Sequence, residues 1–293
     1  MGLGETFALA SAVSWAVAVV LLRKSGETLP AFELNLFKVV LGWVLMLPTA
    51  MLVEGLLIPA FTGVEWLLVI TSGFIGIAVA DTWYLRALNL MGASRTGITG
   101  TLLSPFIIVL SVLFLDERLH GWQYAGLALV LAGVFLVNWR VHRSEIDAAD
   151  LRQGLIYGVS AVFAMAVGVV MVKRILEVHP FFWTVQWRLA GGAAGMLVYT
   201  FLRHKWPAVR VSFRKEQPWF MVTTAALLGT YICMILWLAG YKYTTASIAS
   251  MLNESTSAFI VFFAWLFLKE PMDIRKVIGL VLTLCGVVVV VTW

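Results

Sequence analysis

Charged side chains are scarce in this chain. Asp, Glu, Lys and Arg make up 13% of its 293 residues, hydrophobic types make up 61%, and the mean hydropathy is +0.93. Soluble domains carry about 25% charged residues. This composition therefore excludes an ordinary soluble protein and predicts an all-α integral membrane protein.

Cysteines, histidines and catalytic motifs are also sparse. The two cysteines, Cys233 and Cys285, lie in apolar stretches, where they are most simply small packing residues and imply no disulfide framework. The four histidines fall at predicted loops or helix ends, and no HExxH, GxSxG, phosphate-loop or paired CxxC motif occurs. We therefore predict no enzyme, no metal site and no cofactor.

Apolar stretches long enough to cross a bilayer, about 20 residues each, recur along the whole chain. They start near residues 4, 32, 64, 93, 121, 153, 181, 217, 245 and 272. The first has neither a basic leading segment nor a small-residue cleavage site, so we read it as a retained helix and not as a signal peptide. The pattern predicts ten transmembrane helices.

The chain contains an internal repeat. Residues 113–137, LFLDERLHGWQYAGLALVLAGVFLV, recur at residues 266–290 as LFLKEPMDIRKVIGLVLTLCGVVVV, with eleven of the 25 positions identical. Chance hydrophobic similarity would not retain the pairing of Glu117 with Glu270. The remaining landmarks align at an offset of 150 residues early in each half and 153 later.

We expect two five-helix repeats, residues 1–139 and 153–293, joined by the polar linker 140–152, RVHRSEIDAADLR. An odd number of helices in each half makes the second copy enter the membrane from the opposite side, which predicts inverted repeats. Many transporters use such repeats to build two alternating gates around one central site.

The net charge of +5 comes from Lys and Arg scattered over loop ends, without a contiguous basic face. Anchoring to lipid headgroups explains this charge better than a nucleic-acid partner does. The basic residues are concentrated in the loops that follow odd-numbered helices. By the positive-inside rule, this places both termini outside.

Four ionisable residues lie well inside the apolar stretches: Lys38, Asp81, Arg188 and Glu254. Each costs about 2.5 to 3.5 kcal/mol near a helix centre, so each must face a cavity or a partner. Glu254 is about nine residues into its stretch and close to the midplane. Its equivalent in the first half is Thr101. The acid is therefore present in one half only, which suggests a functional role and not a structural one.

Burial favours the neutral form of a carboxyl group unless a cation lies close. Glu254 is therefore predicted to carry a proton or to meet a substrate ammonium, and the alternative is a static pair with Lys38 or Arg188. These two basic residues are repeat equivalents. They have either a structural role in both halves or bind a substrate carboxylate or phosphate. Asp81, about four residues short of a loop, is expected to have a hydrated or loop-paired role.

Several other residues could line a cavity or shape it. Aromatic candidates beside polar or small residues are Trp15, Trp83, Tyr84, Trp187, Tyr231 and Trp237. Gly97 and Gly100 are expected to allow close helix approach, and Pro105 to kink its helix. Glu117 and Glu270 are read as acids near the start of the helix that follows each of them.

Two stretches resemble the EamA repeat of the drug/metabolite transporter superfamily: ALNLMGASRTGITGTLLSPFIIVLSVLFLDERL and AGYKYTTASIASMLNESTSAFIVFFAWLFLKEP. The resemblance spans nearly the whole chain, although Ala258 stands where Pro105 stands in the first half. It implies inverted repeats, cytoplasmic termini and transport, often export, of amino acids or other small metabolites across a bacterial inner membrane. It also matches Lys38 and Arg188 to a position that the family commonly fills with Arg.

The sequence thus predicts a secondary transporter that works by alternating access. Glu254 would exchange a proton for a substrate ammonium, while Asn253, Ser255 and Thr256 supply neutral hydrogen bonds. The expected partners are a small-molecule substrate, protons and membrane lipids, with the protein a monomer or homodimer. The alternatives are a lipid flippase and a non-transporting membrane scaffold or sensor.

Overall fold

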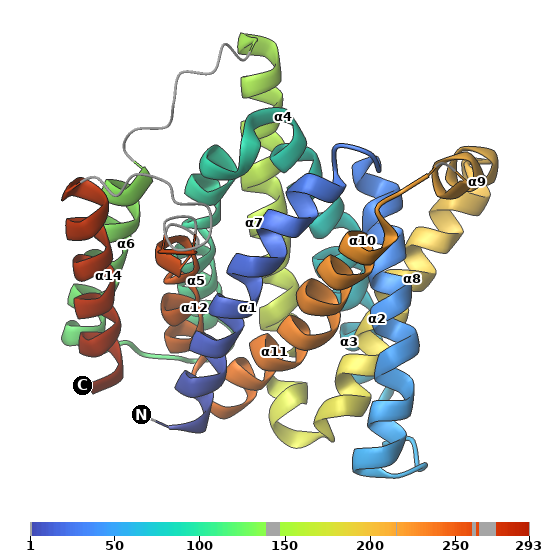
Figure 1. The fold of residues 1–293 in the computed structure, drawn as a ribbon. Helices are drawn as coiled ribbons and strands as arrows, with labels where there is room; N and C mark the ends of the chain where they lie inside the picture. Colours follow the sequence, from blue (N-terminus) through green and yellow to red (C-terminus); the bar gives the residue numbers. More distant parts are fainter. Residues whose placement is uncertain (1, 139–146, 215, 260–261, 264–273, 293) are drawn as a thin grey trace.

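The computed structural model describes residues 2–138, 147–214, 216–259, 262–263 and 274–292. Within these ranges the chain is helical and has no strand (Figure 1). Five described segments are long and apolar enough to cross a membrane: Leu3–Ser25, Ala31–Glu54, Gly63–Gly92, Ala148–Val178 and Trp219–Tyr243. Shorter apolar helices accompany them, which confirms the all-α, multi-pass membrane fold.

The first two helices of each half correspond at an offset of 150. These are α1 (Leu3–Ser25) and α2 (Ala31–Glu54) in the first half, and α7 (Ala148–Val178) and α8 (Phe181–Leu202) in the second. In Figure 1, α1 begins at the lower end and α7 at the upper end, so the two halves run in opposite directions. Since α7 begins at Ala148, the end of the polar linker segment is helical.

The third helix of each half contains a π-helical segment at the equivalent place. In the first half, α3 (Gly63–Gly73) continues through η1 (Phe74–Val79) into α4 (Ala80–Gly100). In the second, α10 (Trp219–Ala226) continues through η2 (Leu227–Ile232) into α11 (Cys233–Tyr243). π segments inside helices are rare and frequently occur at functional sites.

The fourth helix of each half is interrupted in its middle. In the first half, the label α4 covers the end of the third helix and the start of the fourth, which meet at a bend at Gly92, whose φ of 81° only glycine adopts readily. The fourth helix is then interrupted by a turn at residues 101–102 and continues as α5 (Leu103–Phe114). The equivalent turn, at residues 254–255, follows α12 (Ala246–Asn253). Pro105 has no backbone N–H and therefore cannot donate the hydrogen bond that a continuous helix would direct to the carbonyl of residue 101. Yet the second turn forms where Ala258 replaces it, so proline is not required for the break.

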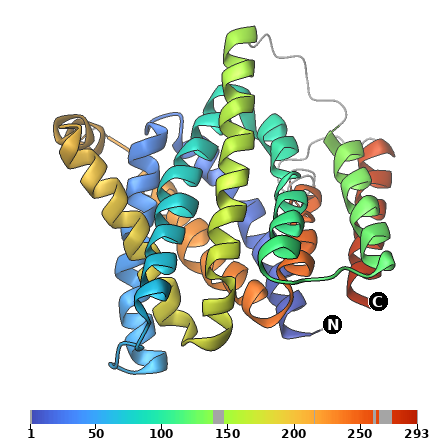
Figure 2. The ribbon, with the colours of Figure 1, turned by 180° about the vertical axis from the view of Figure 1, so that it is seen from behind.

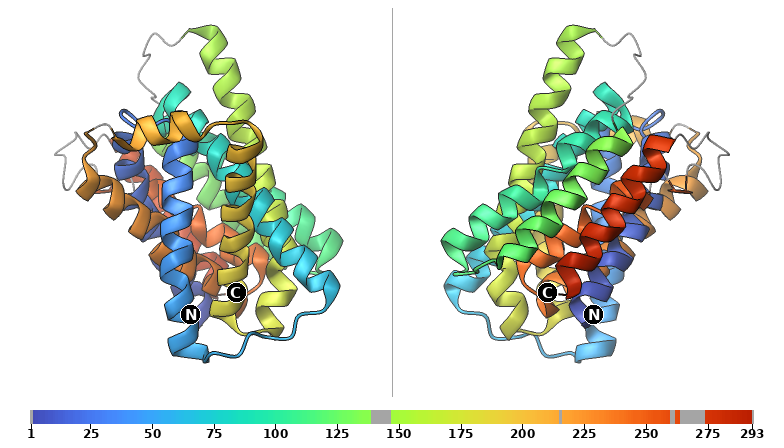
Figure 3. Two further views of the ribbon diagram at one scale, coloured as in Figure 1. Left: turned by 90° about the vertical axis from the view of Figure 1, so that its right-hand side faces the viewer. Right: turned by 90° about the vertical axis from the view of Figure 1, so that its left-hand side faces the viewer.

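The two halves are interleaved and do not form separate bodies. α1 packs along α10, η2, α11 and α12 of the second half, and α7 packs along α3, η1, α4 and α5 of the first (Figure 2). α2 lies beside α8, and α6 (Gly121–Asn138) lies beside α14 (Ile274–Thr292) (Figure 3). The first helix of each repeat therefore packs against the third and fourth helices of the other repeat, whereas the second and fifth helices pack against their own equivalents.

A short helix, α9 (Trp206–Arg214), follows α8 and has no helical counterpart in the first half. Its Val209 is buried, whereas Arg210 and Arg214 are exposed. A helix with one apolar and one basic face is typical of segments that lie in the membrane interface.

Glycines set the close crossing of α6 and α14. A Cβ added at Gly133 would lie 2.6 Å from the carbonyl oxygen of Gly279, and one added at Gly286 would lie 2.7 Å from that of Gly126. Gly126 is the repeat equivalent of Gly279, and Gly133 is that of Gly286, so the same close contact occurs twice along the crossing. No larger residue fits there without a shift of backbone.

We expect Gly133→Ala to destabilise the protein by about 1 to 3 kcal/mol, because the new methyl group overpacks the α6–α14 crossing. Thermal unfolding in detergent measures this. The matched control is Gly121→Ala on the same helix, where no described atom lies within 4 Å of the added Cβ. Equal melting temperatures for the two variants would refute the close crossing.

Candidate functional site

A cavity lies between the interleaved halves. Its volume is about 140 Å³, and helices of both halves contribute to its wall. The lining residues are Ser11, Trp15, Gly76, Asp81, Tyr84, Gly97, Gly100, Leu103, Val162, Met165, Gly229, Cys233, Met234, Trp237, Asn253, Glu254, Thr256 and Ser257. A cavity of this size has room for several water molecules or a small solute.

The repeat axis passes through this cavity, because equivalent positions face it from both halves. The equivalent lining pairs are Trp15 and Met165, Gly76 and Gly229, Asp81 and Met234, Tyr84 and Trp237, Gly100 and Asn253, and Leu103 and Thr256. The positions are symmetric but the side chains are not. The two sides of the cavity, one from each half, therefore differ in their chemistry.

Most of the site residues that the sequence singled out do line the cavity: Trp15, Asp81, Tyr84, Trp237, Asn253, Glu254 and Thr256. Ser255 does not, because its buried hydroxyl donates to the Leu252 carbonyl at 2.6 Å. Lys38 and Arg188 are buried behind the wall. Of the remaining aromatic candidates, Trp187 packs edge-on against Trp66, and Tyr231 bonds to Thr49.

Glu254 is 6% exposed and contacts the start of a helix from the other half. Its Oε1 accepts hydrogen bonds from the Ser104 backbone N–H at 3.2 Å and from the Ser104 hydroxyl at 2.8 Å. Ser104 lies in the first turn of α5, where unpaired N–H groups and the helix dipole favour a negative charge. Among the described residues Glu254 forms no salt bridge, so the static pair with Lys38 or Arg188 is wrong.

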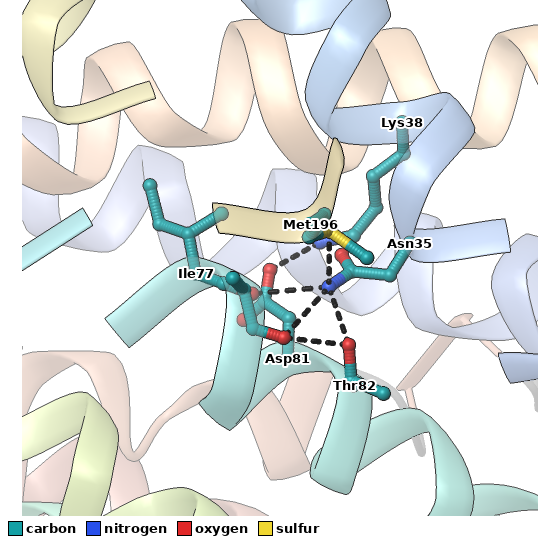
Figure 4. Close-up of polar contacts among 7 residues, drawn as sticks. Asn35, Lys38, Ile77, Asp81, Thr82 and Met196 are labelled. Atoms are coloured by element: carbon teal, nitrogen blue, oxygen red, sulfur yellow. Dashed lines mark hydrogen bonds and ion pairs between the residues drawn. The ribbon is translucent and has the colours of Figure 1, made fainter. Parts of the chain in front are cut away.

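Asp81 forms an ion pair with the buried Lys38, which Figure 4 shows, and its own side chain is 12% exposed in the cavity wall. The expectation that Asp81 lies near a loop is wrong. It follows η1 directly, and the helix continues as far as the bend at Gly92. The third helix extends over 30 residues, from Gly63 to Gly92, beyond the length of about 20 residues on which the hydropathy reading rested.

Asn35 supports the same region and was not singled out from the sequence. Its Nδ2 donates to the Ile77 carbonyl in η1 at 3.0 Å and lies 3.0 Å from the Thr82 hydroxyl (Figure 4). A π segment disturbs the regular helical ladder. The Asn35 amide compensates by serving a carbonyl that the wide turn exposes.

Arg188 occupies the position equivalent to Lys38 but has no equivalent acid, because Met234 stands where Asp81 stands in the first half. The guanidinium is 1% exposed, and its Nη1 donates to the Gly168 carbonyl at 3.0 Å. It lies against two lining residues. Its Cζ is 5.9 Å from the centre of the Trp237 ring, and a Cβ at Gly76 would lie 2.8 Å from Nη2.

Other residues of the site were missed or misread in the sequence. Ser11 Oγ lies 2.6 Å from Asn253 Oδ1 and joins the first helix to the polar run. Gly97 and Gly100 do not mediate helix packing as predicted. No described atom lies within 4 Å of a Cβ added at either glycine, so both keep the cavity open. The signal that could have revealed Ser104 is its position three residues after the run Thr99, Gly100 and Thr101.

Glu117 also serves a helix of the other half. Its carboxylate accepts from the backbone N–H of Ala246 at 2.7 Å and of Ser247 at 3.0 Å, at the start of α12. The sequence reading assigned it to the following helix, α6, which the structure corrects. Its repeat equivalent, Glu270, lies outside the described residues.

Inverted repeats of membrane helices around one central cavity are the architecture of many membrane transporters. The comparison with protein families agrees with this class. The chain belongs to the EamA-like transporter family, whose model matches residues 2–139 and 152–292.

Two relatives come from Bacillus subtilis (strain 168). The uncharacterized transporter YoaV is 23% identical over 221 residues, which cover 73% of this chain and 70% of YoaV. The uncharacterized transporter YvbV is 30% identical over 156 residues, which cover 52% of this chain and 50% of YvbV. A crystal structure with 16% sequence identity matches with a TM-score of 0.77 over 99% of this chain and 97% of that one, which shows a shared fold.

Lys38 and Asp81 should behave as one structural unit when either charge is removed. We expect Lys38→Met to cost about 3 to 5 kcal/mol, because it leaves the Asp81 carboxylate buried without its partner. Adding Asp81→Asn should restore most of that loss. Chemical or thermal unfolding of the three proteins measures the coupling, and additive losses in the double variant would show that the pair is not a structural unit.

Proposed function

We propose that this protein is a secondary transporter that moves a small zwitterionic or amphipathic metabolite, in the outward direction, across a bacterial inner membrane by alternating access. The observation that carries the proposal is the cavity on the repeat axis, with the Glu254 carboxylate in its wall and no cation paired with it among the described residues. Intramembrane acids that face a cavity commonly mark a substrate or proton pathway.

Glu254 has the chemistry for exchange. Both hydrogen bonds from Ser104 fall on Oε1, which leaves Oε2 for a ligand in the cavity. The ionised carboxylate attracts an ammonium group, and protonation removes that attraction. A proton arriving from one side of the membrane would therefore release a bound substrate, and loss of the proton would prepare the site again.

The wall contains the elements that such a cycle needs. Asn253 and Thr256 offer neutral polar groups, and Trp15 and Tyr84 offer aromatic faces, with ring centres 6.1 Å apart. The turns at residues 101–102 and 254–255 divide the fourth transmembrane helix of each repeat at equivalent points. Relative movement of the half-helices about these turns would open the cavity to one side or the other.

The lipid-flippase alternative needs a lateral entrance into the cavity. A groove of about 620 Å³ does lie on the outside, between α2, α8 and α9, and is lined by Leu36, Phe37, Val40, Leu41, Val44, Leu197, Trp206, Val209, Arg210, Phe213 and Arg214. It shares no lining residue with the central cavity. The observations therefore favour a small solute over a lipid, and the open cavity argues against a scaffold with a sealed core.

The test is proton-driven transport by purified protein in liposomes. A panel of amino acids, amines, sugars, nucleosides and lipid phosphates identifies the substrate. We expect substrate binding to weaken as the pH falls, because protonation of Glu254 removes its negative charge. Glu254→Gln should abolish both this pH dependence and gradient-driven uptake while the protein remains folded.

The control is Asp116→Asn, which removes an exposed carboxylate paired with Arg174 outside the cavity. It should transport as the wild type does. Normal transport with the same pH dependence in Glu254→Gln would rule out the coupling role, and no transport of any compound in the panel would rule out the proposed substrate classes.

A further inference from the structure

We infer that Arg188 and Tyr241 form an anion-binding subsite behind Trp237, and that this subsite receives the carboxylate of the transported substrate. The inference rests on the proposed function and adds a second charged contact to it. Nothing in the family match or in the names of the relatives assigns a role to either residue.

Two unpaired donors meet at this place. Arg188 is 1% exposed and Tyr241 is 0% exposed. Among the described residues, Arg188 Nε, Arg188 Nη2 and the Tyr241 hydroxyl have no hydrogen-bond partner. Buried polar groups are normally paired, and a buried charge without a counter-charge is especially costly. A ligand that accepts hydrogen bonds and carries negative charge would satisfy all three groups.

Both donors flank one side chain of the cavity wall. The Arg188 Cζ lies 5.9 Å from the centre of the Trp237 ring, and the Tyr241 ring packs against the same Trp237 ring nearly at right angles with centres 5.2 Å apart. Trp237 lines the cavity, whereas Arg188 and Tyr241 do not. The indole therefore separates the cavity from the two donors, and a change of its rotamer would connect them.

The donor geometry favours a carboxylate. Nε and Nη2 are neighbouring nitrogens on one edge of the guanidinium plane, and their N–H bonds are parallel. This edge matches the two oxygens of a carboxylate in a bidentate arrangement. Nη1, on the other side, is already occupied by the Gly168 carbonyl at 3.0 Å. The structure thus holds the guanidinium in place and leaves its carboxylate-binding edge unused.

Among the described residues, no acid takes this role. Asp81, which pairs with the equivalent basic residue of the first half, is already bound to Lys38. The position equivalent to Asp81 in the second half is Met234. A zwitterion could therefore place its ammonium at Glu254 and its carboxylate at Arg188, beside Tyr241 and Trp237.

The experiment measures ligand-induced thermal stabilisation of the purified protein in detergent. The compounds are neutral amino acids, the amine that corresponds to each without its carboxylate, and the amide of each. We expect the wild type to bind the amino acids at least about fivefold more tightly than their amines and amides, the factor that one hydrogen bond of about 1 kcal/mol provides.

Tyr241→Phe is the gentlest variant, since it removes only a hydroxyl that has no partner. Its unliganded melting temperature should equal or exceed that of the wild type, while the preference for the carboxylate falls at least about threefold. The matched control is Tyr231→Phe, whose lost hydroxyl contacts Thr49 at 2.6 Å. That variant should melt at a lower temperature and keep the full preference. Arg188→Met should bind amino acids and amines alike.

Each outcome separates the subsite from the proposed function. Equal binding of amino acids, amines and amides by the wild type would overturn the subsite and leave the Glu254 mechanism standing. Retention of the carboxylate preference in Tyr241→Phe and Arg188→Met would also overturn it. If no amino acid stabilises the wild type, the subsite is wrong, and proton-driven transport of the other compounds then decides the proposed function separately.

Discussion

The need to satisfy backbone groups inside a membrane is the constraint on which this structure depends. An unpaired N–H or C=O costs several kcal/mol where no water can reach it, so a broken helix must find partners within the protein. Here carboxylates of one half supply them to the other. Glu54 accepts from the start of α8, Glu117 from the start of α12, and Glu254 from the start of α5. These contacts fasten the two repeats together and also place an acid at the centre.

Symmetry and asymmetry have separate roles in the molecule. The backbone is symmetric: π segments and helix breaks recur at equivalent positions, and each repeat inserts its first helix into the other. The charges are not. Lys38 has an acid partner in Asp81, whereas Arg188 has none in the part of the chain that the structure describes, and Glu254 stands where the first half has Thr101. A site on a symmetry axis can hold a ligand with two different ends only when its two sides differ, as they do here.

Some of the site could be predicted because its signals are local. Glu254 is an acid in an apolar stretch, and its absence from the equivalent place is visible in the repeat alignment. Ser104 and Tyr241 carry no such signal, since a serine or tyrosine in a membrane helix is ordinary. Asp81 was misplaced because the third helix continues to the bend at Gly92, past the length of about 20 residues that a membrane span requires. Its pairing with Lys38 depends on how two helices pack, which periodicity does not report.

The sequence by itself determined the membrane class, the duplication and the inversion, because hydropathy, repeat offset and helix parity are properties of the chain order. It also determined which half carries the central acid. Only the tertiary structure decided which charges are paired and which are left for a ligand. Two basic residues at equivalent positions, Lys38 and Arg188, differ in role because α4 brings the Asp81 carboxylate to the first, whereas α11 has Met234 at the equivalent place. Such contacts arise between segments far apart in the chain, where packing and not local pattern sets the distance.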